Sequence, residues 1–184
     1  MLVVGGCSGS DSSSPSAGPS SSATTAAQPV AAEVSLGKVA GTIKKKNRKT
    51  FLDHRKTMLK QVGDAVASWV DGGFVGVDYP RASFDAAFSS FTAQAKRDAT
   101  HQRKLMTNWD LRQKINGVEV ETNKVTIDVM APKGRPAGAT ARVRLVFTTT
   151  GDTEERVTVR GRLLLTPAHG KWRIFGYDVS KGAK

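Results

Sequence analysis

The spacing of apolar residues changes once along this chain, near Trp109, and that change constrains the fold more than any other feature. Before it, Met58, Val62, Val66 and Trp69 recur every three or four residues, which indicates a helix. After it, apolar and polar residues alternate, which is typical of strands with one buried face. Helices followed by consecutive strands predict an α+β domain, in which helices pack on one face of an antiparallel sheet.

Three helical stretches are predicted before the change. The first is a long amphipathic helix over residues 44–71, and Gly72 and Gly73 are expected to end it. A short second stretch follows Ser83, and a third covers residues 93–107. The apolar positions of the two shorter stretches are Phe84, Phe88 and Phe91, and then Ala95, Ala99 and Met106.

Five short strands with turn-rich connections are predicted after the change. Such a run of consecutive strands favours an antiparallel meander. The first four strands are marked by Val118 and Val120; by Val125, Ile127 and Val129; by Ala141, Val143, Leu145 and Phe147; and by Val157, Val159, Leu163 and Leu165. The fifth begins at Trp172 and Ile174 and runs through Phe175, Tyr177 and Val179.

The N-terminal segment has a different composition from the rest of the chain. Residues 8–40 are dominated by Ser, Ala, Gly, Thr and Pro, and few of their side chains are larger than Ala. Such a segment buries too little surface to offset its ordering entropy, so we expect a disordered linker. Residues 41–184 are then the folded domain, and residues 1–7 a separate leader.

Cys7, the only cysteine, stands where the leader meets this linker. The stretch Val4-Gly5-Gly6-Cys7 resembles the lipobox of bacterial lipoproteins, which implies that Cys7 carries the acyl chains of a membrane anchor. Residues 1–4 are too short for the charged and apolar regions of a signal peptide, so we expect a signal truncated upstream. The Ala-, Gly-, Arg- and Val-rich composition is typical of a high-GC actinobacterium.

The element order and the ending "GKWRIFGYDVSKG" support a second resemblance, over residues 44–180. They are similar to NTF2-like domains, in particular SnoaL-like domains and the Mce-associated accessory proteins of actinobacteria. The resemblance implies a cone, in which a curved sheet wraps around the first long helix. Proteins with this fold include enzymes, binding modules and assembly parts, so function depends on the site.

Catalytic and metal-binding motifs are missing from the sequence. His54, His101 and His169 are not grouped, and neither HExxH, CxxC nor GxSxG occurs, so no metal or cofactor is expected. An NTF2-like enzyme of the isomerase or hydrolase type would need a pocket acid with a tyrosine: either Asp78 with Tyr79, or Asp110 with Tyr177. Six aromatic residues either line a pocket in the cone or fill the core: Phe51, Trp69, Phe74, Phe84, Phe88 and Phe91.

The positive charge is confined to the predicted domain. All 28 basic residues lie from Lys38 onward with 14 of the 16 acidic ones, a net charge of +14 for that part. This charge favours anionic partners such as acidic lipid, cell-wall polymer or nucleic acid. Nucleic acid is the weaker option, because an exported protein does not meet it.

Arginine residues alternate with apolar residues in the strands, so we expect them on the outer face of the sheet. Like charges on adjacent strands repel, so either an anionic partner neutralises this face, or Asp152, Glu154 and Glu155 do. The run "KKKNRK" at residues 44–49 is a second basic cluster. The candidate anion-binding residues are Arg142, Arg144, Arg156, Arg160, Arg162 and Arg173.

These features together predict a lipid-anchored protein on the outer face of the cytoplasmic membrane. Its domain is expected to be a non-catalytic binding or accessory module that engages anionic lipid, cell-wall polymer or a protein assembly of the envelope. The alternative is a small NTF2-like enzyme that acts on a hydrophobic substrate inside the cone.

Overall fold

The computed structural model describes residues 31–76 and 79–183, so Cys7, residues 1–30 and Asp78 lie outside the described part. Its helical elements precede most of its strands, as the sequence predicts. They are η1 (Lys45–Asn47), α1 (Arg48–Val70), η2 (Asp71–Val75), η3 (Asp85–Phe88), α2 (Ala93–His101), α3 (Arg103–Met106) and η4 (Pro132–Gly134). The strands are β1 (Glu33–Ala40), β2 (Gly117–Met130), β3 (Gly138–Thr150), β4 (Arg156–Ala168) and β5 (Lys171–Ala183).

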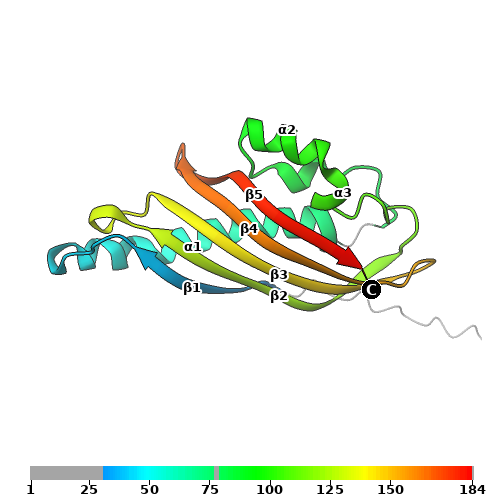
Figure 1. Ribbon diagram of the computed structural model, residues 1–184, viewed down its shortest axis with the longest axis horizontal. Coiled ribbons are helices and arrows are strands. Elements are labelled where there is room, and N and C mark those ends of the chain that lie inside the picture. The colour runs from blue at the N-terminus through cyan, green and yellow to red at the C-terminus, as the bar shows by residue number, and fades with distance from the viewer. Residues whose placement is uncertain (1–30, 77–78, 184) are drawn as a thin grey trace, which may run out of the picture.

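The strands form one five-stranded sheet in the order β1-β2-β3-β4-β5. Strands β2 to β5 are antiparallel neighbours, whereas β1 pairs parallel with β2. The long strands curve together across α1, and the short helices α2 and α3 lie near β5 (Figure 1). The α+β prediction is therefore confirmed, but the expectation of a purely antiparallel sheet is wrong, because β1 adds a parallel edge.

Strand β1 also corrects the predicted boundary of the linker at residue 40. Residues 33–40 pair with β2 from Glu33 opposite Lys124 to Ala40 opposite Met130. Gly63 of α1 passes close to this strand, and a Cβ atom at Gly63 would lie 3.3 Å from Val34. The side chains of β1 are exposed or only half-buried, so the amino-acid composition of this segment is like that of a linker. The segment is ordered because its backbone pairs with β2.

Strand β2 replaces two predicted strands. Its pairing with β3 shifts between Val120 and Thr122, which leaves Glu121 as an extra residue in a β-bulge. The bulge changes which positions point inward, from Val118 and Val120 to Val125 and beyond. This change of phase in the sequence resembles the end of one strand and the start of another.

Helix α1 packs its apolar side against the inner face of the sheet and supplies much of the core. Gly72 and Gly73 do not end the helix as predicted, since the chain continues through them as the π-helical turn η2. A Cβ atom at Gly72 would lie 2.6 Å from the backbone nitrogen of Ala87, so this glycine allows close packing of η3. The third predicted helix is interrupted at Gln102, which separates α2 from α3.

Candidate anion-binding face

The pairing of β3 with β4 brings the predicted arginine residues together on the outer face of the sheet. Arg142 lies opposite Arg162, and Arg144 lies opposite Arg160. All four side chains are exposed, while the positions that alternate with them, such as Leu145, are buried. The geometric part of the sequence prediction is thus confirmed, since four arginine residues share one face.

Lys124 of β2 extends one of these pairs into a row of three cations. It lies opposite Arg144, which lies opposite Arg160, so Lys124, Arg144 and Arg160 form a line across three adjacent strands. We call this line the cationic row. Lys124 forms an ion pair with Glu33 at 3.3 Å, but no ion pair of the described residues includes Arg144 or Arg160. Like charges directly opposite each other are destabilising, so the facing residues Arg144 and Arg160 favour a ligand that neutralises them.

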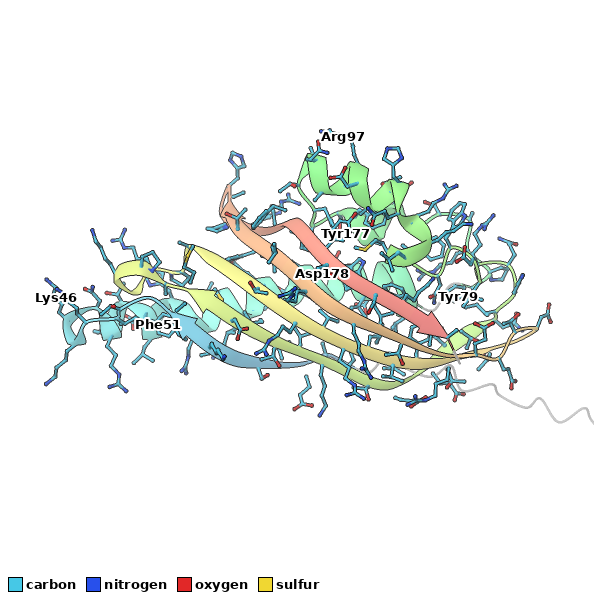
Figure 2. The ribbon with its side chains drawn as sticks, in the orientation of Figure 1. Lys46, Phe51, Tyr79, Arg97, Tyr177 and Asp178 are labelled. Carbon is cyan, nitrogen blue, oxygen red and sulfur yellow. The ribbon has the colours of Figure 1, made fainter. Side chains whose placement is uncertain are left out.

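The arginine residues next to the cationic row have carboxylate partners. Arg142 Nη2 lies 3.1 Å from Asp128 Oδ1, and Arg162 Nη2 lies 2.6 Å from Asp178 Oδ2. Figure 2 labels Asp178, which lies over the middle of the sheet. These exposed pairs add little stability, because solvent screens them. They do cancel charge locally, so the uncompensated charge of the face is concentrated at Arg144 and Arg160.

Arg156 is the first residue of β4 and belongs to a separate ion pair. Its guanidinium group donates to both carboxylate oxygens of Glu121 at 2.6–3.0 Å, and Thr148 also donates to Glu121. These hydrogen bonds from Arg156 lower the pKa of the Glu121 carboxyl below its ordinary value. The bulge in β2 places Glu121 here, so Arg156 is already neutralised.

Arg173 does not join the other arginine residues as predicted. It lies opposite Thr166, and its Nη1 donates to the backbone oxygen of Ser89 at 2.6 Å. The segment after Ser89 runs along β5, where Thr92 N donates to the Ile174 oxygen. Arg173 is therefore drawn to the edge of the sheet, because a backbone acceptor is available there.

The carboxylates that neutralise arginine residues of this face are not the ones that the sequence suggested. Asp152, Glu154 and Glu155 follow β3, and none of them forms an ion pair among the described residues. Asp128 and Asp178 fill that role instead. Alternation along β2 places Lys124 on the same face as Asp128, so this signal was present in the sequence.

The inner face of the sheet is filled by side chains. The six aromatic residues that either line a pocket or fill the core are all buried, with at most 7% of Phe51 exposed. Trp69 meets Phe74 edge to face at 5.4 Å between ring centroids, and Phe74 contacts Phe147 of β3 at 6.2 Å. Phe51, Trp69, Phe74, Phe88 and Phe91 thus belong to one connected core, and Phe84 packs against Trp109.

Tyr79 and Tyr177, the two tyrosine residues considered for catalysis, form no hydrogen bond with an acidic side chain in the described part of the chain. Tyr79 donates to the backbone oxygen of Phe74 at 2.9 Å and accepts from Asn108 Nδ2 at 3.1 Å, and its burial raises its pKa. Asp110 Oδ2 lies 3.9 Å from Lys181 Nζ and forms an ion pair with it. No hydrogen bond joins Asp110 to Tyr177 in the described part of the chain. Tyr177 has a buried hydroxyl group without a hydrogen bond among the described residues.

Lys181 is a partly buried charged residue that sequence reasoning missed. Its Nζ donates to the backbone oxygen of Thr107 at 2.9 Å, and burial lowers its pKa. It lies on the inner side of β5 beyond Val179, where alternation predicts an apolar residue. This contact ties the end of β5 to the segment after α3.

The described residues contain neither a metal-binding cluster nor a helix long and apolar enough to cross a membrane. The three histidine side chains are exposed and lie on α1, α2 and the β4–β5 turn. Comparison of the chain with protein-family models, curated proteins and solved structures gave no match. The case for a function therefore depends on the geometry described above.

Proposed function

We propose that this chain is a membrane-anchored extracytoplasmic lipoprotein whose domain is a non-catalytic binding module for anionic surfaces. The cationic row supports this most directly, because Arg144 and Arg160 face each other without a carboxylate partner among the described residues. Guanidinium groups suit phosphate and carboxylate oxygens and stay charged at physiological pH. The partner is an anionic lipid surface, cell-wall polymer or an assembly of the envelope.

An NTF2-like fold is part of the proposal. A long helix against a curved sheet, short helices at one edge and the "GKWRIFGYDVSKG" ending on β5 support it. The parallel strand β1 is an addition to the pattern that the sequence suggested. In the proposed module the interior serves stability and the outer face serves binding.

The binding test compares vesicles of phosphatidylglycerol and phosphatidylcholine by co-sedimentation. Each basic residue near an anionic membrane contributes about 1 kcal/mol, so Arg144→Gln with Arg160→Gln should weaken binding by about 2 kcal/mol, or roughly 30-fold. Binding by the wild type should also fall steeply between about 0.1 M and 1 M salt.

The matched control replaces Arg55 and Lys56, exposed residues of α1, with Gln. It removes the same net charge from another surface and should reduce binding much less. Equal losses in the two double variants would show that only total charge matters and would contradict a specific face.

The anchor is tested separately at Cys7. In a chain that carries a complete signal peptide, the native host should place the protein in the membrane fraction with Cys7 acylated. Cys7→Ala should release the protein or leave it unprocessed, as fractionation and mass spectrometry would show. An Ala variant that fractionates like the wild type would refute the lipoprotein proposal but leave the binding face open.

A further inference from the structure

The end of the molecule where β2 turns into β3 has two adjoining cavities of opposite chemistry. A groove of about 570 Å³ is lined mainly by apolar residues, and a cavity of about 850 Å³ is lined mainly by basic and polar ones. Ala137, just before β3, borders both. We call them the apolar groove and the basic cavity.

The apolar groove lies on the outer side of the sheet. Met130, Leu164 and Phe175 line it, and they are three of the five large apolar residues that are exposed in the described part of the chain. A register shift in the pairing of β4 with β5 leaves Phe175 as an extra residue, 51% exposed. Three large exposed apolar side chains in one groove indicate a binding surface.

Asp128 brings a carboxylate to the groove, but its charge is already compensated. Asp128 Oδ1 accepts from the backbone nitrogen of Lys38 at 2.7 Å and from Arg142 Nη2 at 3.1 Å. Gly37 makes the first contact possible, since a Cβ atom there would overlap Asp128 Oδ1. The groove can therefore accept an apolar chain beside this residue.

The basic cavity is formed by two loops that meet. Lys44 and Lys46 come from the segment before α1, and Lys133 and Arg135 come from the turn between β2 and β3. Gly134 joins these loops: its φ is +79°, and a Cβ atom there would lie 2.5 Å from the backbone oxygen of Asn47. Figure 2 shows Lys46 at the far end of the molecule, well away from Asp178.

The four basic side chains of this cavity have no ion pair within the described residues. All four are exposed, and Arg135 offers a planar fork for phosphate or carboxylate oxygens. Their mutual repulsion is lowered when an anion lies among them. The basic cavity therefore suits a negatively charged head group.

We infer that the apolar groove and the basic cavity form one site for a single anionic amphiphile. The apolar chain lies over Met130, Leu164 and Phe175, and the charged head lies among the basic residues beyond Ala137. Each of the two volumes, about 570 and 850 Å³, lies within the range of about 300–1,000 Å³ that small-molecule sites occupy. This site is separate from the cationic row, so the inference goes beyond the proposed function and does not depend on it.

The test uses dodecyl phosphate below its micelle concentration, with binding measured by titration calorimetry on the full chain. We expect one molecule to bind per chain. Butyl phosphate lacks the long chain and dodecyl maltoside lacks the charge, so each should bind at least about tenfold more weakly. Because the probe is monomeric, this experiment measures binding of a single free molecule and not attachment of the protein to a vesicle.

Two double variants test the two halves of the site. Lys133→Gln with Arg135→Gln removes charge from the basic cavity, and Met130→Ser with Phe175→Ser removes apolar surface from the groove. Each should weaken dodecyl phosphate binding by about tenfold or more. Arg144→Gln with Arg160→Gln should leave it within about twofold while lowering vesicle binding.

Three results would overturn the inference. Binding that needs the basic residues but not Met130 and Phe175 would indicate a plain phosphate site. Binding unaffected by either double variant would place the probe elsewhere. A dimer that dissociates when Met130 and Phe175 are replaced would make the groove an interface between two copies. If that variant does not fold, Leu164→Ser, also at an exposed position, repeats the test.

Discussion

Trp69 lies at the centre of the core and makes two kinds of contact there. Its side chain is fully buried, and its ring meets Phe74 edge to face. Its Nε1 donates to the backbone oxygen of Met106 at 3.0 Å, so the one polar atom of the indole is satisfied. The residue thus joins α1 to the turn η2 and to the end of α3.

Truncation of Trp69 should therefore be costly. Trp69→Ala leaves a large cavity and an unpaired backbone oxygen, so we expect a loss of about 3–5 kcal/mol in the free energy of unfolding, measured by urea denaturation. Leu52→Ala is the matched control on the same helix, because Leu52 is 46% exposed, and it should cost under about 1 kcal/mol. Similar losses at both positions would show that α1 does not pack as described.

Elements with a regular pattern could be predicted from the sequence, and elements that depend on distant pairing could not. The apolar period of α1 and the alternation in β3 and β4 are local signals, and they place Arg142 and Arg160 correctly on the outer face. Strand β1 lacks such a signal, because its order comes from pairing with β2 far along the chain. The partners Asp128 and Asp178 depend on the register between strands, which two β-bulges modify.

The close approach of β4 and β5 gives a test at this scale. A Cβ atom at Gly161 would lie 2.2 Å from the backbone oxygen of Asp178, so a side chain there forces the two strands apart. Gly161→Val should reduce the free energy of unfolding by about 3 kcal/mol or more in urea denaturation. A Cβ atom at Gly182 of β5 would meet no atom within 4 Å, so Gly182→Val should be nearly neutral. A neutral Gly161→Val would mean that the strands are more widely spaced.

Positive charge dominates the molecule as a whole, and we expect it to lower the stability of the fold while it favours binding to anionic partners. The chain has a formal net charge of +12, and the described residues concentrate cations without an ion pair on two surfaces, at Arg144 and Arg160 of the cationic row and in the basic cavity. Such repulsion destabilises a compact state. Salt screens repulsion within the protein and attraction to an anionic partner alike, so it should act on the two properties in opposite directions.

Thermal unfolding at two concentrations of NaCl tests this relation. The exposed salt bridges contribute little, so the gain from screening net repulsion should outweigh their loss, and we expect Tm to rise between about 0.05 M and 0.5 M NaCl while vesicle binding falls. Arg144→Gln with Arg160→Gln removes a like-charge pair worth about 0.2–1 kcal/mol, so its Tm should exceed that of the wild type by up to about 4 °C at low salt.

This gain in Tm should shrink as salt rises, because the wild-type repulsion is then already screened. The control with Arg55 and Lys56 replaced by Gln removes no cross-strand pair and should show a smaller gain. A variant that becomes more stable while it binds vesicles less well identifies residues kept for binding at some cost in stability. If its Tm instead fell, Arg144 and Arg160 would be stabilising parts of the fold, and the binding face would have to lie elsewhere.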